Sequence, residues 1–220
     1  MRKTKIAYGE YYHIYNRGNN KQMIFRDVRD WMRFLFLIIY NQSNCVFYNL
    51  NRQISHYVKH RVFNINPILL EKIKRNRNIH LVSFAIMPNH FHLILKESSD
   101  NGISKYMQRI QNSYTKYFNT KYKMSGHLFQ GPYQAVHVKT NNQILHLASY
   151  IHRNPRELGE WKNRESNYPW SSYQDYTKSN RWNSLLSNQI LIKQFKNKNE
   201  YKKFVETSSA KELNESIAID

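Results

Sequence analysis

The stretch IHLVSFAIMPNHFHLILK, residues 79–96, decides the fold that we predict for this chain. Two strand-like runs, 79–86 and 90–96, flank the tripeptide MPN, and Pro-Asn is a favourable turn pair, so the stretch predicts a β-hairpin. Successive side chains of a strand point to opposite faces, which places His90 and His92 on one face and a row of Phe and Leu on the other. The apolar row faces the core, and the two imidazoles point away from it.

Further elements are predicted on both sides of the hairpin. In chain order they are a strand at 10–17, a helix over RDVRDWMRFLFLIIYN with Asp27 as its N-cap, a helix at about 103–121, a strand at about 133–139, and a helix over NQILHLASYIHR that stops before Pro155. Apart from the last helix, the order is βαββαβ, which predicts an α+β fold: an antiparallel sheet with helices packed on one face. The other face is then free for chemistry, and His90 and His92 lie there.

The chain is predicted to form one main domain and a tail. The domain spans 1–178 and contains an insertion at about 41–78, for which we expect one short helix. Residues 179–220 form a basic helical tail, with a helix at about 187–206 dominated by Lys and polar residues.

The charge of the chain favours a polyanionic partner. Lys and Arg together number 34 against 15 Asp and Glu, for a formal charge of +19 and a pI near 9.9. Such an excess favours nucleic acid before a membrane surface. A codon bias towards Lys, Asn and Ile would explain the lysines, but it explains the shortage of acidic residues less easily.

Cysteine content and hydropathy indicate the compartment. The single cysteine, Cys45, excludes an intramolecular disulfide and a thiolate metal cluster, so we expect a reducing compartment. The most apolar window, WMRFLFLIIY at 31–40, is too short to cross a bilayer, and MRKTKIAYGEYYH has no apolar run long enough for a signal peptide. These features predict a cytoplasmic protein without a membrane partner.

The pair His90 and His92 has three interpretations. The simplest is two histidines on a solvated sheet face. A closed zinc site is disfavoured, because it needs four ligands, usually including cysteines. The third is an open site for a catalytic divalent ion, in which two imidazoles and one further side chain leave positions for phosphate oxygens. Mixed nitrogen and oxygen ligands suit Mg²⁺, Mn²⁺ or a similar ion.

The segment SYIHRNP, 149–155, offers partners for such an ion. Residues i and i+4 lie on one helix face, so the phenol of Tyr150 and the amide of Asn154 converge if the last turn does not unwind before Pro155. We expect Asn154 to complete the metal shell and Tyr150 to face a bound phosphate.

The reaction that these groups support transfers a phosphodiester bond of DNA to a tyrosine. The phenol attacks phosphorus and expels a 3′ hydroxyl, and the DNA stays covalently joined to the tyrosine through its 5′ phosphate. The step can then reverse on another strand without ATP. The phenol needs activation, since its reference pKa is about 10. Tyr114 and Tyr117 are rivals of Tyr150, but their apolar helical row favours a packing role.

Four basic residues are candidates for phosphate contacts: Arg17, Arg109, Lys116 and Arg153. Arg17 is preferred, because it ends the first predicted strand beside a turn rich in Gly and Asn. For each of the four, solvated surface charge is an equally weighted alternative.

Several uncommon strings occur in one order along residues 8–178: YHIYNRGNNKQMIF, FAIMPNHFHLIL, KYMQRIQNSYTKYFN, SGHLFQGPY, YIHRNP and YPWSSY. They resemble the one-tyrosine transposase-like proteins, and most of all the REP-associated tyrosine transposases. This resemblance implies a ferredoxin-like sheet, a divalent metal held by His90 and His92, a helical nucleophile at Tyr150 and an amide four residues on, at Asn154. It also implies cleavage and joining of single-stranded DNA at hairpin-containing elements, by a monomer or a homodimer.

Two departures from the family pattern stand out. Gln130, Gly131 and Pro132 stand where a QGR-type motif carries a basic residue, so one phosphate contact is expected to be missing. After Asn154 and Pro155 the chain reads RELG instead of small apolar residues, which we interpret as peripheral. The leading hypothesis is a metal-dependent DNA strand transferase. The alternatives are a non-catalytic binder of single-stranded DNA or RNA on the same scaffold, and a metal nuclease that activates water.

Overall fold

The chain folds around a single four-stranded antiparallel sheet with the strand order β2-β3-β1-β4. The strands are β1 (Tyr11–Arg17), β2 (Ile79–Met87), β3 (His90–Glu97) and β4 (Gln134–Val138). The computed structural model describes residues 5–45, 49–60, 62–63 and 66–208.

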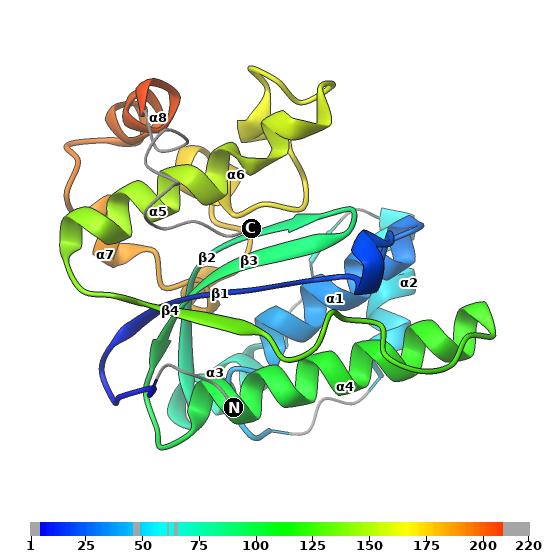
Figure 1. The fold of residues 1–220 in the computed structure, drawn as a ribbon. Coiled ribbons are helices and arrows are strands. Elements are labelled where there is room, and N and C mark those ends of the chain that lie inside the picture. Colours follow the sequence, from blue (N-terminus) through cyan, green and yellow to red (C-terminus); the bar gives the residue numbers. More distant parts are fainter. Residues whose placement is uncertain (1–4, 46–48, 61, 64–65, 209–220) are drawn as a thin grey trace.

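Two long helices form a layer on one side of the sheet. They are α1 (Val28–Tyr40) and α4 (Gly102–Tyr122), and both lie below the sheet in Figure 1. Asp27 begins α1 with a capping box, as its position in the sequence predicts. Phe91 on β3 packs against Phe34 on α1, with ring centroids 5.0 Å apart, so the apolar row of the hairpin faces this layer. The element order and strand order confirm the predicted α+β, ferredoxin-like fold.

The insertion contains two helices, where the sequence predicts one. They are α2 (Leu50–His60) and α3 (Pro67–Arg75). The side chain of Asn66 caps α3, and Pro67 occupies its first turn, a favourable pair of signals for the start of a helix. The scattered apolar residues of this region conceal the helical period.

The second face of the sheet is partly covered. Helix α5 (Asn141–Arg153) contacts β2 and β3, and α6 (Tyr173–Thr177) and α8 (Lys198–Thr207) lie on the same side of the sheet, opposite to α1 and α4 (Figure 1). The expectation that this face is free is therefore wrong for the part over β2.

The outer edge of β2 is paired with the segment 168–172. The backbone N–H of Ile86 donates to the carbonyl of Trp170, and that of Ser172 donates to the carbonyl of Phe84, each at 2.9 Å. Because an unpaired edge strand is a template for aggregation, this pairing protects the sheet.

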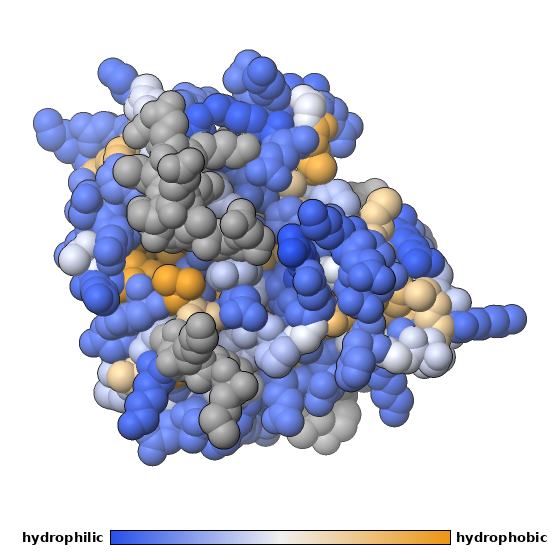
Figure 2. All heavy atoms as spheres, viewed as in Figure 1, coloured by the Kyte–Doolittle hydropathy of each residue, from blue (hydrophilic) through white to orange (hydrophobic). Residues whose placement is uncertain are grey.

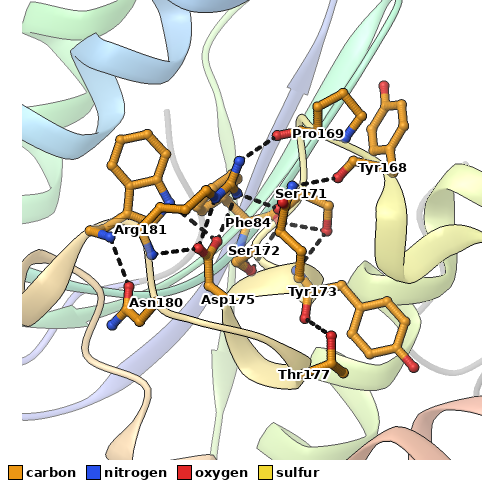
Figure 3. A network of polar contacts seen from close by, with 12 residues as sticks. Phe84, Tyr168, Pro169, Ser171, Ser172, Tyr173, Asp175, Thr177, Asn180 and Arg181 are labelled. Atoms are coloured by element: carbon orange, nitrogen blue, oxygen red, sulfur yellow. Dashed lines mark hydrogen bonds and ion pairs between the residues drawn. The ribbon is translucent and has the colours of Figure 1, made fainter. Parts of the chain in front are cut away.

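A buried ion pair fixes that segment (Figure 3). Arg181 Nη2 lies 2.8 Å from Asp175 Oδ2, and the same guanidinium donates to the carbonyls of Pro169 and Ser171 at 3.0 Å. Asp175 also accepts from the indole N–H of Trp182 at 3.2 Å. The carboxylate and the guanidinium are thus satisfied by several hydrogen bonds, as a buried pair requires.

The tail packs against the domain. Instead of one helix at 187–206 it forms α7 (Gln189–Ile192) and α8, and α8 contacts α5 and α6. The hydroxyl of Tyr201 on α8 lies 2.8 Å from Nδ1 of His152 on α5. The tail therefore holds α5 against the sheet. The predicted tail residues 209–220 lie outside the described residues.

The surface seen in Figure 2 is mostly hydrophilic, with small apolar areas between charged side chains. The most exposed large apolar side chains of the described residues are Ile68 and Tyr8, which lie far apart in the sequence. Among the helices that the structure describes, none has both the length and the hydropathy needed to cross a membrane.

Candidate active site

His90 and His92 lie on β3, on the face of the sheet that α5 partly covers. β1 pairs with β3 so that Arg17 is opposite His90 and Tyr15 is opposite His92. Opposite residues of antiparallel strands share a face, so β1 adds the side chains of His13, Tyr15 and Arg17 to the face that carries the two predicted ligands.

A pocket of about 600 Å³ opens over these residues. Its lining includes His90, His92, Tyr150 and Asn154, the four residues predicted as ligands and nucleophile. In the sequence, His90 and Asn154 are separated by 64 positions. The packing of α5 on the hairpin brings the four residues together.

Tyr150 is half-buried at the pocket. Its ring is edge-on to that of His92, with centroids 5.5 Å apart. Asn154 directly follows α5 and keeps helical dihedral angles, φ −52° and ψ −40°, although it precedes Pro155. Tyr150 and Asn154 therefore remain on one helix face, and the last turn does not separate them.

His90 is held between two amides. Its Nδ1 lies 2.7 Å from Oδ1 of Asn89, and its Nε2 lies 3.2 Å from Oδ1 of Asn154. Asn89 Nδ2 donates to the carbonyl of Lys21 at 3.1 Å. This bond orients the Asn89 amide so that its oxygen faces the imidazole.

The donor atoms around His90 fit a divalent ion. Neighbouring oxygen ligands of octahedral Mg²⁺, each about 2.1 Å from the ion, lie about 3.0 Å apart. The 3.2 Å between Nε2 of His90 and Oδ1 of Asn154 is close to that spacing. Within the described ranges, no three His, Cys, Asp or Glu residues are grouped as a metal site. A site here thus depends on the amide oxygen of Asn154 beside His90 and His92.

Burial keeps the imidazoles of the pocket neutral. Burial lowers the pKa of His90, while the nearby amide oxygen of Asn154 and the charge of Glu157 oppose that shift. The pKa of His92 is held well below its ordinary value, chiefly by burial and also by the neighbouring His13. A neutral imidazole is the form that coordinates a metal ion.

His13 belongs to the site and was missed in the sequence. It is fully buried, its Nε2 lies 3.0 Å from Nδ1 of His92, and burial lowers its pKa to about 3. The alternation of YHIY, 12–15, places His13 and Tyr15 on one face of the strand, which the sequence alone indicates. The sequence does not indicate that this strand pairs with β3, and that pairing brings His13 to His92.

Tyr15 is a second phenol in the pocket, and the sequence did not single it out. Its ring centroid lies 6.0 Å from that of His92 and 5.0 Å from that of His13. Burial raises the pKa of Tyr15, so the phenol is protonated at neutral pH.

The rivals suggested by the sequence, Tyr114 and Tyr117, lie in the α4 layer. The hydroxyl of Tyr114 donates to the carbonyl of Ile24 at 2.6 Å, and that of Tyr117 donates to Asp30 Oδ1 at 2.9 Å. Both belong to the packing between α1 and α4, on the side of the sheet away from the pocket.

The four residues predicted to contact phosphates do not all lie on the same side of the sheet. Arg17 lines the pocket, and its Nε donates to Oε1 of Gln130 at 2.5 Å. Arg153 is the last residue of α5 and is not part of the pocket lining; its charge acts on Tyr173. Arg109 and Lys116 lie on α4, and the guanidinium of Arg109 donates at 2.6 Å to the backbone carbonyl that follows α1.

One residue from each of the two departing segments, Gln130 and Glu157, lines the pocket. Gln130 accepts the hydrogen bond from Arg17, and Lys21 adds a cation to the same wall. Glu157 lies on the 3-10 helix η2 (Asn154–Leu158), and its charge acts on His90. The interpretation of RELG as peripheral is therefore wrong for Glu157.

Comparison with known proteins supports the fold and finds a likeness to one transposase family over part of the chain. The family model described as "Transposase IS200 like" matches residues 58–154. The resemblance to the IS200-like transposases is thereby confirmed. The IS200-like segment contains the hairpin, Tyr150 and Asn154, whereas β1 precedes it and the tail follows it.

One similar solved structure is described as "Structure of the REP associates tyrosine transposase bound to a REP hairpin". It has a TM-score of 0.53 and 15% identity, over 81% of this chain and 86% of that chain. At this identity the similarity shows a shared fold. A search of curated proteins finds no match.

Proposed function

We propose that the protein is a metal-dependent transposase that cleaves and rejoins single-stranded DNA through a 5′-phosphotyrosine on Tyr150. The observation that carries this proposal is the meeting of Tyr150 with His90, His92 and Asn154 in one pocket. The family match supports the transposase class. The hairpin in the similar structure supports a substrate that contains a DNA hairpin.

His90, His92 and Asn154 are the residues that would hold Mg²⁺ or Mn²⁺. Such an ion supplies polarisation of a phosphate oxygen and offsets the charge that develops on it. The two imidazoles are already neutral in the fold, because burial lowers the pKa of each. They therefore release no proton when they bind a cation.

Tyr150 is the nucleophile. Its hydroxyl oxygen attacks phosphorus, the bond between phosphorus and the 3′ oxygen breaks, and overall the phenol proton ends on that oxygen. The 5′ phosphate remains on Tyr150 as a phosphodiester, so a free 3′ hydroxyl can reverse the step without ATP.

Arg17 and Lys21 hold the phosphates of the bound strand, since both cations line the pocket. Tyr15 offers an aromatic face to a base beside the scissile bond, the mode by which single strands are bound without a base code. A phosphate contact by Arg153 requires DNA that extends beyond the pocket lining. Contacts by Arg109 and Lys116 require DNA that continues around the sheet to α4.

All four residues of the proposed site come from one chain. α5 brings Tyr150 to the sheet of its own chain, and the bond from Tyr201 to His152 fastens α5 there. We therefore expect a monomer to carry out the cleavage step.

The experiment is a denaturing gel of the protein incubated with hairpin-containing single-stranded DNA and Mn²⁺. The wild type should form a protein–DNA adduct, Tyr150→Phe should form none, and Tyr15→Phe should keep it. The second variant is a matched control, because it removes a hydroxyl from the same pocket.

The other outcomes separate the alternatives. An adduct that forms with Tyr150→Phe but not with Tyr15→Phe would identify Tyr15 as the nucleophile. Cleavage without any adduct supports a nuclease that activates water. Retention of DNA without cleavage supports a non-catalytic binder.

A further inference from the structure

The two imidazoles proposed as ligands are each contacted at Nδ1 by a residue that lies behind them. Asn89 Oδ1 lies 2.7 Å from Nδ1 of His90, and His13 Nε2 lies 3.0 Å from Nδ1 of His92. In both rings the second nitrogen is Nε2, which in His90 lies 3.2 Å from Oδ1 of Asn154. His90 and His92 both line the pocket.

The contacts of Asn89 determine the proton of His90. Asn89 Nδ2 donates to the carbonyl of Lys21 at 3.1 Å, so its Oδ1 faces His90 as an acceptor. The Nδ1 of His90 must then be the donor, and a neutral imidazole with a proton at Nδ1 has none at Nε2. The lone pair of Nε2 therefore faces Oδ1 of Asn154, another acceptor, at 3.2 Å. Two acceptors that meet in this way are a preformed place for a cation.

The bond between His13 and His92 is open to two arrangements. Either His92 donates from Nδ1 and its Nε2 is a free lone pair, or His13 donates from Nε2 and His92 carries its proton at Nε2. The Nδ1 of His13 has no partner among the described residues, so no second contact of His13 chooses between the two arrangements. In the first arrangement the proton of His13 lies on this nitrogen. Only the first arrangement lets His92 act as a ligand beside His90.

We propose that Asn89 and His13 are positioning residues that hold His90 and His92 in matching tautomers, each protonated at Nδ1 with Nε2 free toward the pocket. The inference rests on the proposed metal role of the two histidines. His13 does for His92 what a carboxylate or a backbone carbonyl commonly does behind a metal-bound histidine: it accepts the other ring proton and fixes the ring. An imidazole in this place adds no charge to the site, because His13 is neutral.

The first test is the proton position in the metal-free wild-type protein. Long-range ¹⁵N–¹H correlation spectra distinguish the two ring nitrogens of each histidine, with His92→Gln and His90→Gln used for assignment. Protonated Nδ1 in both rings is the expected result. A proton at Nε2 of His92 would overturn the role of His13, and a proton at Nε2 of His90 would overturn that of Asn89.

The second test is Mn²⁺ affinity without DNA, measured by calorimetry. His13→Leu removes the acceptor and should weaken binding about 10–100-fold, the usual cost of losing such a partner. His13→Gln presents an amide oxygen and should restore most of the affinity. His80→Gln replaces another half-buried histidine, which bonds to Ser187 at 3.1 Å, and should leave the affinity unchanged.

The two proposals fail in different ways. Wild-type affinity in a folded His13→Leu protein would overturn the inference and leave the proposed function intact. A wild type that binds no Mn²⁺ would overturn the metal role, and the proton positions in the metal-free protein would still decide the roles of His13 and Asn89. If His13→Leu does not fold, the wild-type spectra provide the decision.

Discussion

At the scale of single residues, the surroundings decide what a buried histidine does. His92 has one nitrogen on His13 and the other toward a pocket. His152 is equally buried, but both of its nitrogens have protein partners: Ser172 at 2.9 Å and Tyr201 at 2.8 Å. The contacts of His92 leave a lone pair for a ligand, whereas the contacts of His152 only stabilise the fold.

Replacement of His90 should separate activity from stability. His90 lies on the pocket face, whereas Phe91 is fully buried against α1. We expect His90→Ala to abolish the DNA adduct and to change the free energy of unfolding by less than about 1 kcal/mol. Phe91→Ala should cost about 3–5 kcal/mol, because it opens a cavity in the core. Urea unfolding checks both values, and equal losses would contradict the placement of His90.

The charge of Glu157 should be visible at His90. Burial lowers the pKa of His90, Glu157 raises it and Arg17 lowers it. Glu157→Gln should therefore lower the pKa of His90 further, while Arg17→Gln should raise it. Titration of the His90 ring signals by NMR measures both directions. Shifts of the same sign in the two variants would show that general loosening, not charge, is responsible.

At the scale of elements, α5 is the part that assembles the site. Thr140 caps its start, and its side chain accepts from the N–H of Gln143. Near its end, His152 joins it to Ser83 on β2 at 3.0 Å and to Tyr201 on α8 at 2.8 Å. The position of Tyr150 thus depends on contacts made by the neighbouring turn and by the tail.

The contacts of α5 make stability depend on pH. Burial lowers the pKa of His152 to about 3, so the unfolded chain binds a proton first as pH falls. The stabilisation is present above about pH 6.5, the unfolded value, and is lost as pH falls from there toward about 3. At about pH 5.5 the loss from this one group is about 1.4 kcal/mol.

Urea unfolding at about pH 7.5 and at about pH 5.5 measures the difference in the free energy of unfolding that the linkage relation predicts. His152→Gln removes the titrating group and should reduce the difference between the two conditions, although it also lowers stability at both. An unchanged difference would assign the effect to the other buried histidines, His13 among them, whose pKa is also about 3.

At the scale of the whole molecule, the charge of +19 and the sheet together predict where the proposed DNA substrate binds. Arg17 lies at the pocket, whereas Lys116 lies on α4, on the opposite side of the sheet. Both attract polyanions at long range, but only a cation in contact with a phosphate releases a counterion on binding.

The salt dependence of DNA binding should therefore differ between two variants of equal charge. Arg17→Ala should reduce the slope of log affinity against log salt by about 0.7, the value for one phosphate contact with a single strand. Lys116→Ala should leave the slope nearly unchanged. Fluorescence anisotropy with a short single strand measures both, and equal slopes in the two variants would extend the binding surface to α4.

Much of this protein follows from local sequence. The hairpin at 79–96, the row that carries His90 and His92, and the pair Tyr150 and Asn154 all appear as predicted. These features have periods of two or of 3.6 residues, which the backbone imposes within a few residues. The helix caps at Asp27 and Thr140 are local as well, because each cap bonds to backbone groups within three residues.

Tertiary structure alone decided which of these features meet. His13 reaches His92 across 79 positions of sequence, and Glu157 enters the pocket on η2. The alternation along β1 is identical whichever strand lies beside it, so no period in the sequence specifies the partner of His13. That choice depends on the packing of α1 and α4 beneath the sheet and of α5 above it, where apolar contacts between distant segments replace contacts with water.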